Sequence, residues 1–199
     1  LGENDQAVSF AEQVLLTYPE DTSILSAYSI ALGREDRVDD AVAALQRIET
    51  IDPEYPNLFA RQAQMLLQAD RRDDAVPVMQ RAVTNGADPE QMAQILFGDA
   101  FNKGLDPKNP DRSLAYALSG IAAAKGFEIG AELKAQLDFW HGYGLFQRGL
   151  AQQEPNTLAS AQASLPSFQQ AVPLLQAGAS YAPQVGVDPN QIIQATQQY

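Results

Sequence analysis

A repeat of 34 residues constrains this sequence more than any other feature. Residues 5–8, 39–42 and 73–76 align at that spacing, which makes Ala7, Ala41 and Ala75 equivalent, and Pro19 and Pro53 keep the same interval. A small residue lets two helices cross closely, and proline is tolerated beyond a helix end. Each helix pair leaves one apolar face for the next pair to cover, so the chain must fold as a stack of helix pairs.

The residues around these alanines resemble the tetratricopeptide repeat family. The first repeat with both helices, starting at Thr22, supplies the expected large and small residues: Leu25, Ser29, Leu32, Ala41, Leu45, Ile48 and Pro53. The next, starting at Pro56, supplies Phe59, Ala63, Leu66, Ala75, Met79 and Ala82. The resemblance implies an all-α fold, a right-handed α-solenoid of antiparallel helix pairs. Asp36 and Asp70 occupy the place of the glycine that usually precedes the second helix.

The repeat predicts how the chain is divided. Residues 1–127 form the repeats: a half repeat at 1–20, repeats at 22–55 and 56–89, and a degenerate repeat at 90–127. Residues 128–199 form a long degenerate helix pair and a C-terminal capping helix, continuous with the same solenoid. Because 1–20 matches only the second helix of a repeat, we expect the chain to be a fragment, a processed product or the ordered part of something longer.

The second half of the sequence contains signals of helix starts and helical spacing, but the 34-residue period is no longer clear. Asp88-Pro89 and Asp188-Pro189 each predict a helix start, with aspartate as the cap and proline in the first turn. A helix over about 129–150 pairs with one that starts near Thr157, and we expect the latter to kink or split near Pro166. Six aromatic residues at helical spacing are predicted to be core: Phe97, Phe101, Phe139, Trp140, Tyr143 and Phe146.

Charge and composition exclude several classes of partner. The chain has a formal net charge of −12, and residues 1–56 alone carry 12 acids and 3 arginines. This acidity argues against nucleic acid and favours a basic partner or simply a solvated face. No apolar run approaches the ~20 residues of a membrane-spanning helix, so direct membrane insertion is not expected. We expect a bacterial protein from the character of the sequence. The absence of cysteine is equally compatible with the cytoplasm and the periplasm.

No set of residues predicts catalysis, a metal or a cofactor. His141 is the single histidine and lacks a second histidine, a cysteine or a strained serine with which to act, so we interpret it as packed or half-exposed. The carboxylate pairs Asp39/Asp40 and Asp73/Asp74 precede second helices, where acids favour the helix N-terminus. An enzyme reading would require a catalytic domain outside this chain.

The resemblance also implies a binding surface, because the family lines its inner groove with first-helix residues. These positions, with the adjacent Arg61, offer polar groups to a protein or peptide: Arg34, Asn57, Arg61, Gln64, Gln68, Asn102 and Lys103. Family members that clamp chaperone tails place lysine and asparagine where this chain has Ser26 and Ile30, or Ala60 and Gln64. The sequence therefore disfavours that clamp.

These observations predict a non-enzymatic scaffold or adaptor that binds a protein or peptide, within an oligomer or a larger complex. The alternative is a permanent structural subunit that packs through its C-terminal helices.

Overall fold

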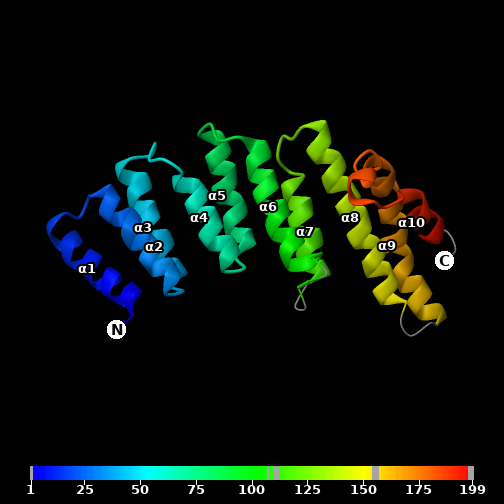
Figure 1. Ribbon diagram of the computed structural model, residues 1–199, viewed down its shortest axis with the longest axis horizontal. Coiled ribbons are helices and arrows are strands. Elements are labelled where there is room, and N and C mark those ends of the chain that lie inside the picture. The colour runs from blue at the N-terminus through cyan, green and yellow to red at the C-terminus, as the bar shows by residue number, and fades with distance from the viewer. Residues whose placement is uncertain (1, 107, 110–112, 154–156, 197–199) are drawn as a thin grey trace. The chain divides into compact units, whose positions relative to one another are not determined.

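The computed structural model contains α-helices and one short 3-10 helix, with no strand among the residues it describes, which are 2–106, 108–109, 113–153 and 157–196 (Figure 1). The all-α prediction is confirmed. The chain divides into two compact units, Leu1–Gly86 and Ala87–Tyr199.

The first unit is built from helix pairs in which α2 packs on α3 and α4 packs on α5, with α1 packed on α2. Its helices are α1 (Glu3–Thr17), α2 (Thr22–Arg34), α3 (Val38–Ile51), α4 (Leu58–Gln68) and α5 (Arg72–Thr84). Leu25, Leu45 and Ile48 are fully buried between these helices. Pro53 follows α3 directly, as a residue that cannot continue a helix should.

The burial of the repeat alanines shows whether neighbouring helices cover the equivalent face of each second helix. Ala41 and Ala75 are fully buried, whereas Ala7 on α1 is exposed. The same helix exposes 66 % of Phe10, although its counterparts Ala44 and Val78 are buried. The helix face that is buried on α3 and α5 is therefore exposed to solvent on α1.

The turn between the helices of a pair is the same in both repeats. Asp36 and Asp70 adopt the left-handed backbone at φ 59° and 58°, the conformation in which glycine is usually found. Aspartate tolerates this conformation better than most residues, which accounts for its place here.

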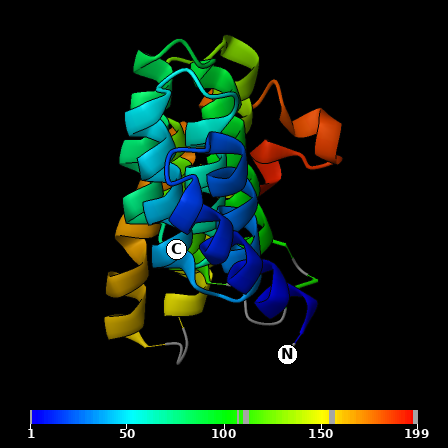
Figure 2. The same cartoon turned by 90° about the vertical axis from the view of Figure 1, so that its left-hand side faces the viewer.

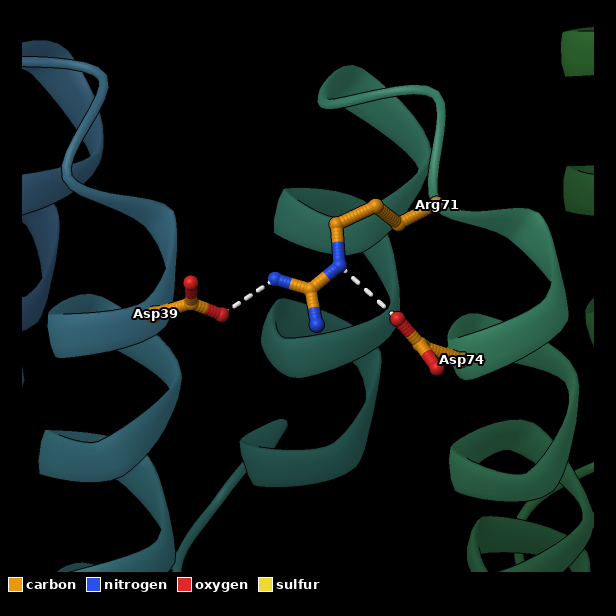
Figure 3. Close-up of polar contacts among 3 residues, drawn as sticks. All are labelled: Asp39, Arg71 and Asp74. Carbon is orange, nitrogen blue, oxygen red and sulfur yellow. Dashed lines mark hydrogen bonds and ion pairs between the residues drawn. The ribbon is translucent and has the colours of Figure 1, made fainter.

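Each of these turns is followed by an arginine that pairs with the start of the second helix. Arg37 Nε lies 2.8 Å from Asp40, and Arg71 Nε lies 2.8 Å from Asp74. Arg71 also reaches Asp39 on α3, so it bridges two repeats (Figure 3). All these side chains are well exposed, so solvent and salt screen each pair and these pairs stabilise the fold only weakly. The carboxylate pairs are therefore helix-start residues, as the sequence indicates.

The second unit contains two helix pairs, of which the second is long, and a returning C-terminal segment. Its elements are α6 (Pro89–Gly104), α7 (Leu114–Ala124), α8 (Ala131–Gln152), α9 (Leu158–Ala177), the 3-10 helix η1 (Ala182–Val185) and α10 (Pro189–Thr196). After α9 the chain turns back, so that η1 and α10, orange to red in Figure 2, lie on the side opposite the gold first half of α9. The predicted caps are present, since Asp88 Oδ1 accepts the Glu90 N–H and Asp188 Oδ1 accepts the Asn190 N–H.

Two expectations for this unit are corrected. Helix α9 continues through both Pro166 and Pro173, so the expected split near Pro166 is wrong. Both prolines face solvent, where water can satisfy the carbonyls they leave unpaired, while Phe168, Ala171 and Leu175 are buried on the other face. The predicted helix end at Tyr199 lies outside the described residues.

The second correction concerns the aromatic residues expected in the core. The expectation holds for Phe139, which is fully buried, and for Trp140 and Phe146, which pack against the core around it. Trp140 is nevertheless only half-buried, like Phe101 and Tyr143, and these three rings line an open pocket. Helical spacing places these rings on one side of their helices, and it does not reveal whether a neighbouring element closes over them.

Candidate protein-binding surface

The first-helix face of the first unit is formed by α2 and α4, which lie in contact. A guanidinium nitrogen of Arg61 on α4 donates a hydrogen bond to the Ser26 hydroxyl on α2. Farther along, the open space at Gly33 is filled by Met65, whose methyl carbon would lie 3.6 Å from a Cβ at Gly33. These two contacts bring Arg34 and Arg61, both predicted binding residues, onto neighbouring helices of one face.

Arg34 and Arg61 have no carboxylate partner among the described residues, and Arg47 on α3, which donates to the Pro19 carbonyl, is like them in this respect. Arg34 is exposed and Arg61 is half-buried, with a neutral hydroxyl as its bonded partner. Arg37 and Arg71, by contrast, are neutralised by aspartates. The partners of Arg37 and Arg71 raise their pKa, so those two arginines stay charged and paired.

Three further predicted residues belong to α4 or its start. Gln64 and Gln68 are exposed on α4, where Gln64 corresponds by the 34-residue repeat to Ile30 of α2. Asn57 is exposed too, but it is the residue before α4 and adopts a left-handed backbone at φ 59°. The left-handed turn explains why asparagine occupies this position, and the sequence analysis did not predict this structural role.

Asn102 and Lys103 lie on α6 in the second unit. Lys103 Nζ is 2.9 Å from Asp99 Oδ1, and the same ammonium lies 5.4 Å from the centre of the Tyr116 ring. The Tyr116 hydroxyl donates to Asp99 Oδ2 at 2.7 Å, which completes a link between α6 and α7. Asn102 is exposed. Five of the seven predicted residues are therefore in the first unit, and two are in the second.

His141 is half-buried on α8, which agrees with the packed or half-exposed histidine predicted from the sequence. Its Nδ1 is buried without a hydrogen-bond partner, and burial, helped by the positive charge of Lys125, lowers the pKa of the imidazole. Lys125 itself pairs with the buried Asp138 at 2.5 Å, and Lys134 pairs with the same carboxylate at 3.2 Å. This arrangement favours a neutral histidine beside a buried structural ion pair.

Two larger features of the described residues bear on function. No three histidine, aspartate or glutamate side chains within them are grouped as metal ligands. None of the helices seen in the structure is both long and apolar enough to cross a bilayer.

Comparison with known proteins extends the fold assignment. No family model and no curated protein matches the sequence. Among solved structures, a tetratricopeptide-repeat protein from Bacteroides fragilis is similar over 98 % of this chain and 91 % of its own, with a TM-score of 0.58 at 10 % identity. A MamA double mutant is similar over 90 % of this chain and 89 % of its own, with a TM-score of 0.45 at 16 % identity. The chain thus has the helical fold of a tetratricopeptide-repeat protein.

Proposed function

We propose that this chain is a non-enzymatic scaffold that binds an extended protein segment on the first-helix face of its first unit. The observation that carries the proposal is the presence of Arg34 and Arg61 on adjoining helices without carboxylate partners among the described residues. An exposed arginine gains most from a carboxylate, which it can bind through two parallel hydrogen bonds. The fold supports the proposal because stacked helix pairs expose extended faces suited to such segments.

The spacing of the two arginines suggests what the segment looks like. Arg61 is bonded at Ser26, and Arg34 lies eight residues farther along α2, which is about 12 Å at 1.5 Å per residue. An extended chain covers that distance in roughly four residues. Ile30 lies between them and is 39 % exposed, so it offers an apolar contact. Gln64 and Gln68 can bond the ligand backbone.

The overall charge narrows the ligand further. The first 56 residues have nine more acids than bases, so a uniformly acidic segment would be repelled. We therefore expect two carboxylates, roughly four residues apart, in a segment that is otherwise neutral or basic.

A displayed library of 12-residue peptides, selected on the whole chain, tests this directly. We expect selected peptides to carry two acids at that spacing, and R34E/R61E to weaken their binding at least tenfold by fluorescence anisotropy. R47E is the matched control, because Arg47 is an exposed arginine on α3 whose guanidinium donates a hydrogen bond to the Pro19 carbonyl. Equal binding by R34E/R61E and R47E would refute the assignment of this face.

A second candidate, a permanent structural subunit, is favoured by one observation on α9. Leu158 is 78 % exposed and Leu165 is 41 % exposed, seven residues apart on the same helix. Residues at this spacing share a face, which suits packing against another protein. In that case L158S/L165S would release the chain from its complex during size-exclusion chromatography, while R34E/R61E would not.

A further inference from the structure

The second unit contains a pocket of about 410 Å³ that lies outside the surface proposed above. Its walls come from α6, the first residue of α7, α8, and the segment that returns after α9. Aromatic side chains form much of it, namely Phe101, Phe139, Trp140 and Tyr143, while Val185 and Val187 of the returning segment complete it. The pocket is partly open to solvent, so a ligand can enter it without a rearrangement of the helices around it.

The rings of the pocket are held in place by one another. The Phe101 and Trp140 ring centres are 4.9 Å apart at 75°, and those of Trp140 and Tyr143 are 5.7 Å apart at 89°. Both are edge-to-face arrangements, which are the favourable geometry for aromatic pairs. The Trp140 indole N–H donates to the Tyr181 hydroxyl at 3.4 Å, so the one polar group of the indole is already directed to a neighbour. The pocket is therefore formed before a ligand arrives, which lowers the entropic cost of binding.

The polarity of the lining decides the chemistry of the ligand. None of the described residues that line the pocket is charged, so these residues offer no counter-charge to an ionised ligand group that loses its water there. Gln147 and Tyr143 are among the lining residues, and neither the Gln147 amide nor the Tyr143 hydroxyl has a side-chain hydrogen-bond partner among the described residues. An apolar pocket of 300–1,000 Å³ with a few polar groups is the usual form of a small-ligand site.

We propose that this pocket binds an uncharged aromatic group that carries one hydrogen-bonding substituent. The ring stacks among Phe101, Trp140 and Tyr143, and its substituent bonds the Gln147 amide. The ring can belong to a free small molecule or to a side chain of another protein. Both sources present the same chemistry to the pocket.

The test uses N-phenyl-1-naphthylamine, a neutral aromatic amine, with the whole chain. Trp140 is the only tryptophan, so energy transfer from it shows that the probe binds in its vicinity, and the variants below locate the probe in the pocket. We expect saturable one-to-one binding with energy transfer. The sulfonated analogue, 8-anilino-1-naphthalenesulfonate, has the same ring skeleton with a negative charge and should bind at least tenfold more weakly.

Two variants locate the probe. V187F fills the pocket from its rim and should weaken binding at least tenfold, with thermal unfolding used to verify that it folds. Q147L removes the amide and should weaken binding about fivefold, the usual effect of one hydrogen bond. Q170L, on the exposed surface of α9, is the matched control and should bind as the wild type does. The proposal is overturned if Q147L and Q170L bind alike, if energy transfer is absent, or if the sulfonate binds as tightly.

Displacement of the bound probe then distinguishes the sources. Displacement by 4-ethylphenol but not by a heptapeptide of alanines with a central tyrosine indicates a free molecule. Displacement by the peptide at a lower concentration than the phenol indicates a protein side chain. Displacement by neither contradicts the assigned ligand chemistry.

Discussion

Replacement of Gly142 by alanine tests how closely α8 and α9 pack. A Cβ at this position would lie 2.9 Å from Leu175 Cγ and 3.0 Å from the Ala171 carbonyl oxygen, well inside the 3.5–4.0 Å of a normal contact. Alanine stabilises a helix interior by about 1 kcal/mol relative to glycine. Overpacking a core costs about 1–3 kcal/mol, so the net effect of G142A should be a loss of about 0–2 kcal/mol.

Gly98 provides the matched control. It also lies inside a helix of the second unit, but apart from its chain neighbours and the nearby backbone of its own helix, no described atom lies within 4 Å of the Cβ that alanine would add. G98A should therefore stabilise the unit by about 1 kcal/mol through helix propensity alone. The two variants should differ by about 1–3 kcal/mol, which is the steric cost by itself.

Urea unfolding followed by Trp140 fluorescence measures this difference, because Trp140 lies on α8 and reports the second unit. The midpoint should fall for G142A and rise for G98A while the slope stays constant, as expected when only stability changes. If G142A stabilises as much as G98A, α8 and α9 do not approach each other at Gly142, and the packing described above is wrong.

Three further predictions concern the repeat, a turn and the histidine. A41L should cost about 1–3 kcal/mol because Ala41 is fully buried, whereas the equivalent A7L should be nearly neutral because Ala7 is exposed, as measured by urea unfolding. D36A should be less stable than D36G by about 1 kcal/mol, since φ at Asp36 is 59°, and equal stability in thermal unfolding would contradict this backbone. Because burial lowers the folded-state pKa of His141 below its ordinary 6.5, the unfolded chain binds the extra proton, so stability is full above pH 6.5 and falls as pH drops through that value. H141Q should flatten this pH dependence in unfolding experiments between pH 7.5 and 5, and an unchanged profile would count against the buried, neutral histidine.

Much of the local structure could be predicted from residue spacing. The interval between Ala41 and Ala75 indicated which helix faces would be buried, because a small residue is needed wherever two helix backbones cross. Asp36 and Asp70 marked the turns, since few other residues enter the left-handed conformation that their φ angles show. Thr157 was likewise correctly identified as a helix cap. These features depend on neighbours a few residues away, and such neighbours can be read along the chain.

The candidate sites depended on contacts between residues far apart in sequence. Arg61 and Lys103 look alike as cations in the sequence, but Arg61 meets a serine from the preceding repeat while Lys103 is held by an aspartate and a tyrosine. Trp140 looked like core, and only the course of the chain after α9 made it the wall of a pocket.

The sequence by itself thus determined that this protein is a stack of helix pairs, because periodic spacing specifies which faces are apolar. Only the tertiary structure decided which cationic side chains lack a carboxylate partner and which aromatic side chains remain accessible to solvent. The pairing of a cation with a carboxylate and the covering of an aromatic ring both depend on distances of a few ångströms between segments far apart in the sequence. No local sequence pattern encodes those distances.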